Sequence, residues 1–320
     1  MNKIDQILEK AFTSGDLANG GLLNPEQAAK LVQGIFDSAV VSVEARREPM
    51  KASKRQIDKM TFTGDILQKP VAVGTEHTNT TSPTTTKVTL DAKEVIIALD
   101  LGYDALEDSI EGASLQDSII QMCASKLGFE LDQLILNGDA PGGGGTKLDV
   151  LDGLFKQITT NTYDAIGQAV LNEVTLSAAY KKLPSQYSDL IDGYRFYVSH
   201  LARINYIDVL GAKAVNDAFS MYLVGGKEPQ YMGIPVRKVG AIPTYVVTAA
   251  NPPTIPVDIL GSKALLIHPK NIVLGIHRDI SWEFERKPRH RVVQITMTMK
   301  LDVKLEREDA CVKITNIKHA

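Results

Sequence analysis

The sequence predicts an α+β protein of two lobes that carries a long extended arm. A threonine-rich segment, 74–87, separates two stretches with strand character. A long amphipathic helix is expected at 114–137, and the chain closes on strands whose apolar and polar side chains alternate from residue 292 onwards. A long helix, paired strands and a polar excursion between them together indicate an α+β architecture.

The composition is that of an ordinary globular protein. The chain has 320 residues, 44% of them hydrophobic and 23% charged, with a formal net charge of −3. At roughly 150 residues per domain, this length predicts about two lobes. A protein that grips nucleic acid by its phosphates usually carries a clear positive excess, so that class is disfavoured. Two cysteines make no disulfide framework, and no secretory signal or run of 18 apolar residues is present, so we expect a soluble cytoplasmic protein.

The first helix is expected to begin at residue 24. Asn24 is a good N-cap, Pro25 suits the first helical position, and apolar residues then recur at helical spacing as far as Val43. The apolar face of this helix requires a partner surface.

The arm is expected from two strand-like stretches, 59–74 and 87–102, that flank the threonine-rich segment. Seven of the fourteen residues in 74–87 are Thr, and a normal hairpin closes in two to five residues. A two-stranded arm is marginally stable alone in water, so it needs a surface to lie on. The sequence leaves two interpretations open, an arm that lies on another molecule and a disordered loop without a partner.

The helix at 114–137 is the strongest element of the chain. Ser114 is its expected N-cap, and a stripe of apolar side chains runs along it to Ile135. At 1.5 Å per residue it spans on the order of 35 Å, long enough to support a sheet. After about residue 150 short helices and strands alternate, which predicts the second lobe, and further strands are expected at 264–276, 292–306 and 310–317.

The order of these pieces resembles the major capsid proteins of tailed phages, which have the HK97-like fold. "GGLLNPEQ", "ALDLGYDALEDS", "DQLILNGD", "LDGLF", "LSAAYKKLPSQY" and "GIPV" follow one another in that order, and the resemblance runs from about Gly20 to the C-terminus. It implies an N-arm, an extended β-hairpin E-loop, a P-domain with a long spine helix and a β-sheet, and an A-domain. The implied boundaries are 1–47 for the N-terminal arm, 48–100 for the E-loop, 101–149 for the P-domain, 150–265 for the A-domain, and 266–320 for closing strands shared between the A- and P-domains.

The resemblance also implies a function and partners. We expect a chain that self-assembles into hexamers and pentamers of an icosahedral shell around double-stranded DNA, without sequence-specific binding and without a membrane. About nineteen residues precede Gly20, so scaffolding is expected from a separate protein or from none. A portal and a decoration protein are further expected partners, with assembly in the host cytoplasm and residence in the virion. An encapsulin-like nanocompartment is the alternative within the same fold, and a soluble two-lobed enzyme is the remote one.

No motif predicts catalysis, a cofactor or a metal. The run "GGGG" at 142–145 lacks the spacing of a phosphate-binding loop, and the six His show no paired ligand spacing. The acidic stretch 104–111 is interpreted as a charged surface rather than a cation site. The protein is therefore expected not to be an enzyme.

Assembly contacts are instead expected from charged and threonine-rich segments. The basic run "RKPRHR" at 286–291 fits either a solvated loop or ion pairs with acidic residues of neighbouring copies. The candidate contacts between subunits are Arg46, Arg47, Lys69, Thr80, Thr81, Lys87, Asp104, Glu107, Asp108, Arg286, Arg289 and Arg291. The candidate hinges, chosen because glycine adopts conformations closed to other residues, are Gly64, Gly74, Gly102 and Gly143.

Overall fold

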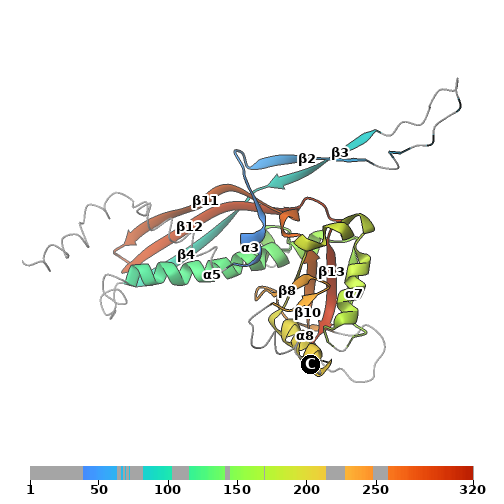
Figure 1. Cartoon of the computed structure of the whole chain (residues 1–320). Helices are drawn as coiled ribbons and strands as arrows, with labels where there is room; N and C mark the ends of the chain where they lie inside the picture. The colour runs from blue at the N-terminus through green and yellow to red at the C-terminus, as the bar shows by residue number, and fades with distance from the viewer. Residues whose placement is uncertain are drawn as a thin grey trace, which may run out of the picture.

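The chain folds into two bodies joined side by side and a hairpin that projects from one of them (Figure 1). This computed structural model describes residues 39–62, 66–67, 69, 72, 82–102, 115–140, 145–168, 170–213, 228–247 and 259–319. The described strands form a four-stranded sheet, a larger sheet in the second body, and the two-stranded hairpin. The prediction of an α+β protein is confirmed.

The first body is an elongated sheet with one long helix that runs along it (Figure 1). Its strand order is β1-β11-β12-β4, with β1 parallel to β11 and the other pairs antiparallel. Ile295, Met297 and Met299 alternate along β12 and are buried, as the period-2 pattern predicts. The strands are β1 (Arg46–Pro49), β4 (Lys93–Gly102), β11 (Ile272–Lys287) and β12 (Val292–Leu305).

The long helix α5 (Leu115–Asn137) confirms the helix expected at 114–137. Leu127, Leu131 and Leu134 lie on its buried stripe, within one core that includes the inward face of β12. Short elements complete this region: α3 (Val41–Glu44), the 3-10 turn η2 (Lys147–Val150) and α6 (Leu154–Gln157).

The second body is a mixed sheet of order β5-β13-β10-β6-β8-β7, with β9 paired to β10. Helices α7 (Glu173–Lys182) and α8 (His200–Lys213) contribute Leu176 and Tyr206 to its core. Asn172 caps α7 by accepting from the Thr175 backbone N–H at 2.9 Å. The remaining elements are β5 (Thr162–Asp164), η3 (Ser185–Gly193), β6 (Arg195–Val198), β7 (Gln230–Tyr231), β8 (Ile234–Lys238), β9 (Tyr245–Val247), β10 (Ile259–Ile267), η4 (Pro269–Asn271) and β13 (Val312–Lys318).

The strand expected at 264–276 is broken in the structure, and the break is where the chain passes between the two sheets. Strand β10 ends at Ile267 in the second body, and β11 starts at Ile272 in the first. Pro269 cannot donate a ladder hydrogen bond, and the His268 side chain accepts from the Lys270 backbone N–H, so the chain turns there. Strand β13 then returns to the second sheet.

The projecting hairpin lies within the range 48–100 expected for the E-loop, whose boundaries stay a prediction. It pairs β2 (Lys54–Phe62) with β3 (Pro83–Asp91), from Lys54 opposite Asp91 to Phe62 opposite Pro83. The expected strand at 87–102 is divided at Ala92, after which β4 joins the four-stranded sheet. Burial of Leu90 and Ala92 against the body fixes that division.

Within the first body, the chain after α5 and the chain before α6 meet at a close approach of two glycines. Gly153 N donates to Gly138 O at 2.8 Å, and a Cβ on Gly153 would stand 2.4 Å from Gly138 N. Asp139 N also donates to Leu148 O at 2.8 Å. These contacts fix the end of α5 relative to η2 and α6. The candidate hinge Gly143 lies outside the described residues, and its role stays a prediction.

Candidate assembly surfaces

The hairpin β2–β3 carries apolar side chains that the single chain leaves exposed. Met60 is 68% exposed and Phe62 56%, and Leu67, beyond the paired region, is 94% exposed. Only Ile57 of β2 packs against a buried cluster, at the base of the hairpin. Exposed apolar groups gathered on one projection mark an interaction surface.

An apolar contact and a buried carboxylate hold the base of the hairpin. Met50, Leu90 and Ala92 pack with Val273 of β11. Asp302 of β12, 4% exposed, accepts from the Asp91 backbone N–H at 2.7 Å. Burial raises the pKa of Asp302, and the hydrogen bond from the Asp91 backbone opposes this rise. The hairpin therefore leaves the body from a rigid base.

Arginines near this base have acidic partners within the same chain. Arg46 contacts Glu48 at 3.1 Å and Glu306 at 2.7 Å, and Arg55 contacts the same Glu48 at 3.1 Å. Arg47 points to the opposite side of β1 and is exposed, and partial burial lowers its pKa. A contact of Arg46 or Arg47 with a neighbouring subunit stays a prediction, and Arg46 would have to leave or share these partners.

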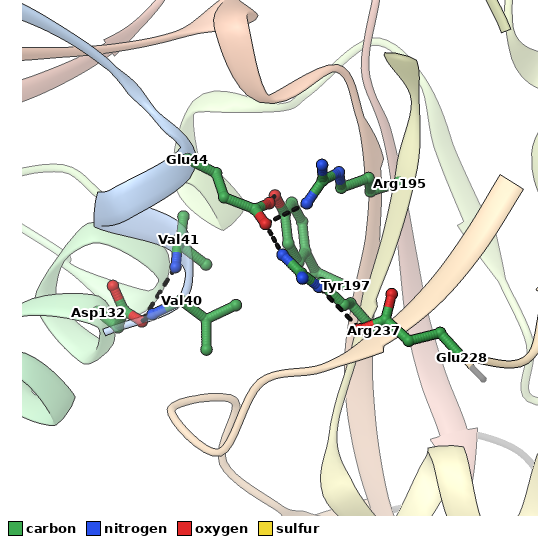
Figure 2. Close-up of polar contacts among 8 residues, drawn as sticks. All are labelled: Val40, Val41, Glu44, Asp132, Arg195, Tyr197, Glu228 and Arg237. Atoms are coloured by element: carbon green, nitrogen blue, oxygen red, sulfur yellow. Dashed lines mark hydrogen bonds and ion pairs between the residues drawn. The ribbon is translucent and has the colours of Figure 1, made fainter. Parts of the chain in front are cut away.

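The short helix α3 joins the two bodies through two carboxylates (Figure 2). Asp132 of α5 accepts from the backbone N–H groups of Val40 and Val41 at 2.6 and 3.1 Å. Burial raises the pKa of Asp132, against the lowering effect of these hydrogen bonds. On the other side Glu44 accepts hydrogen bonds from Arg195 and Tyr197 and forms an ion pair with Arg237, all from the second sheet. Burial raises the pKa of Tyr197.

The basic run forms the turn between β11 and β12, beside the end of β4. His290 N donates to Lys287 O at 3.0 Å, and Arg291 has a positive φ of 51°. Arg286, Arg289 and Arg291 are exposed there. Val292, directly after this turn, pairs with Gly102, the last residue of β4. In the sequence, the acidic stretch 104–111 begins two residues after Gly102.

The other predicted contact and hinge residues are dispersed. Lys69 and Lys87 are exposed on the hairpin segment. Gly102 ends β4 with open space where a Cβ would stand. These positions do not converge on one site, and their roles stay predictions. Outside the described residues lie Thr80, Thr81, Asp104, Glu107, Asp108, Gly64, Gly74 and Gly143.

Sequence reasoning did not find the contacts around α3. Glu44 and Arg237 lie far apart in the chain, and neither belongs to a recognised motif. The available signal was an acidic residue, Glu44, at the start of the mostly basic run 44–55. Within the described part of the chain, no group of three or more His, Cys, Asp or Glu residues could hold a metal ion, and no described helix is long and apolar enough to cross a membrane.

Comparisons with known proteins agree with a shell-forming architecture. The Phage capsid family matches residues 19–316. The putative prophage capsid protein YqbE of Bacillus subtilis (strain 168) is 32% identical over 319 residues, which cover 98% of each chain. The chain therefore belongs to the Phage capsid family, and it is a major capsid protein.

Solved structures identify the fold as HK97-like. The capsid of a native GTA particle is similar with a TM-score of 0.60 and 13% identity, covering 87% of this chain and 90% of that one. The SrpI encapsulin of Synechococcus elongatus PCC 7942 is similar with a TM-score of 0.57 and 9% identity, covering 87% of each chain. At these identities the two likenesses concern the fold alone.

Proposed function

We propose that this chain forms the hexamers and pentamers of an icosahedral shell that encloses the double-stranded DNA of a tailed phage. The observation that carries the proposal is the projecting hairpin, whose Met60 and Phe62 stay exposed in the single chain. At roughly 25 cal/mol per Å² of apolar surface, burial of two such side chains favours association by a few kcal/mol per contact. Many equivalent weak contacts make a closed shell stable.

The charge of the chain supports loose enclosure of DNA. The net charge of −3 leaves no general attraction to phosphate, which suits a shell that is filled and emptied. A separate scaffolding protein, a portal and a decoration protein are proposed partners during assembly in the host cytoplasm. The proposed end point is the virion, and the proposed role is structural rather than enzymatic.

Substitution of the two exposed hairpin residues tests the assembly surface. Met60→Ser combined with Phe62→Ser should leave the unfolding midpoint of the subunit within about 1 °C, because neither side chain is buried in the chain. Shell yield, measured by electron microscopy and sedimentation, should fall at least about tenfold. Met122→Ser on α5 is the matched control, since Met122 is also exposed, at 72%. Normal shells from the double variant would refute the role of the hairpin.

The encapsulin-like alternative shares the fold and differs in cargo. Its support is the fold-level likeness to the SrpI encapsulin. Shells purified from cells in which the phage genes are expressed should contain nuclease-protected double-stranded DNA. Shells that contain one folded enzyme and no nucleic acid would favour the nanocompartment.

A further inference from the structure

Helix α3 is too short to hold its own conformation. It has four residues, Val41–Glu44, and its closing hydrogen bond runs from Ala45 N to Val41 O at 3.0 Å. Helix nucleation costs more than one such bond returns, so a single turn persists only where other groups hold it. The groups that hold α3 therefore decide how the chain enters this turn.

The first of these groups is Asp132 on the long helix α5. Its two carboxylate oxygens accept from the backbone N–H groups of Val40, Val41 and Ser42 at 2.6, 3.1 and 3.0 Å. The first-turn N–H groups of a helix have no partner inside the helix, and this carboxylate supplies one. Val41 and Ser42 are fully buried against α5, so this side of α3 is part of the body.

The second group is Glu44, which reaches to the other body (Figure 2). Its carboxylate contacts Arg195 and Tyr197 on β6 and Arg237 on β8, two strands that pair in parallel. Arg237 also contacts Glu228 at 3.0 Å. A carboxylate between two guanidinium groups forms charge-assisted hydrogen bonds, which are stronger than neutral ones.

The outer side of α3 is open. Val43 is 44% exposed, and a pocket of about 300 Å³ lies between α3 and the second body, lined by Ala39, Val43, Arg203 and Lys238 among others. The chain after α3 is fixed, because β1 pairs with β11. Movement of α3 away from the second body would uncover Val41 and Ala45, which belong to the core around α5, but it would leave the strands of both sheets paired.

We propose that α3 is a latch between the two bodies, and that Glu44 is a positioning residue that sets the direction in which the chain enters this turn at Ala39. Glu44 acts through Arg195 and Arg237. When its contacts are lost, both guanidinium groups can turn to water, since their side chains are 32% and 34% exposed. The expected result is a local opening of 40–45 and not an unfolding of either sheet.

Hydrogen–deuterium exchange on the full-length subunit tests the latch. In Glu44→Gln, exchange at residues 40–45 should rise at least about tenfold, while exchange in β10 and β13 stays unchanged. Glu228→Gln is the matched control, because Glu228 contacts Arg237 but makes no hydrogen bond or ion pair with α3 among the described residues. Glu44→Asp, which keeps the charge, should restore part of the protection. Unchanged exchange at 40–45, or an equal rise across all elements, would overturn the proposal.

The effect on assembly is a separate measurement and rests on the proposed function. Glu44→Gln subunits should give shells of mixed size or open sheets, and Glu228→Gln should give normal shells. Uniform shells from Glu44→Gln, despite faster exchange at 40–45, would refute the positioning role. Absence of shells from the unmodified protein would instead refute the proposed function and leave the exchange result standing.

Discussion

Single residues near α3 and the C-terminus act through partners that are distant in sequence. Glu44 pairs with Arg195 and Arg237. Arg46, expected to contact a neighbouring subunit, pairs with the distant Glu306 as well as with nearby Glu48. Charge and spacing reveal that a side chain needs a partner, but the tertiary fold selects which one. The sequence could therefore suggest charged contact residues and could not pair them.

Glu308 gives a pH-dependent prediction at this scale. Burial alone would raise its pKa, but four hydrogen bonds from the N–H and O–H groups of Thr159 and Thr160, at 2.7–3.0 Å, lower the pKa to about 2. A lowered carboxyl pKa contributes stability above the ordinary value of 4.5, and this contribution is lost as the pH falls toward 2.

Glu308→Gln should therefore lower the free energy of unfolding by about 1–3 kcal/mol at pH 7. The difference from the unmodified protein should shrink between pH 4.5 and 2, measured by urea unfolding at each pH. Glu285→Gln, at a 69% exposed position with one contact at 3.6 Å, should change stability by less than about 0.5 kcal/mol. If the effect of Glu308→Gln on stability does not change with pH, the lowered pKa of Glu308 is contradicted.

Elements with a long, regular pattern could be predicted, and elements that change partner within one apolar stretch could not. The helix α5 and the alternating strand β12 follow their hydrophobic periods. The stretches 87–102 and 264–276 each divide between two sheets. Periodicity reports the local conformation of a strand, but the identity of its neighbour depends on contacts far along the chain.

The glycine crossing between α5 and α6 gives a prediction at the element scale. In Gly153→Ala, the new Cβ would stand 2.4 Å from Gly138 N and 2.7 Å from Leu136 O, which are backbone atoms and cannot turn aside. The variant should lose at least about 2 kcal/mol of stability, measured by chemical denaturation. Gly167→Ala, with open space at its Cβ, is the control and should be near neutral. Equal stability of both variants would show that this crossing does not fix α5 relative to α6.

At the scale of the whole molecule, the order of the elements predicted more than any single motif. No catalytic or metal motif was present to guide the assignment, and the family match over residues 19–316 confirms the class that the order indicated. The surfaces on which subunits meet could not be derived, because each lies partly on another copy of the chain. That is why the hairpin and the basic turn were recognised as candidates without their partners.

The basic turn gives a prediction about association of whole subunits. Arg289→Glu with Arg291→Glu reverses two exposed charges between β11 and β12 and should prevent capsomer formation if acidic groups of neighbouring copies face this turn. Size-exclusion chromatography with light scattering measures the oligomer. Arg289→Lys with Arg291→Lys preserves the charge and should assemble normally. If the charge-reversed variant forms capsomers as the unmodified protein does, the turn is a solvated loop and not a contact between subunits.

Electron microscopy of the purified protein, alone and with candidate scaffolding proteins, tests the central claim most directly. The account predicts closed icosahedral shells, tens of nanometres across, with hexamers and pentamers visible in class averages. A uniform population of monomers or dimers under every condition would contradict self-assembly as a property of this chain.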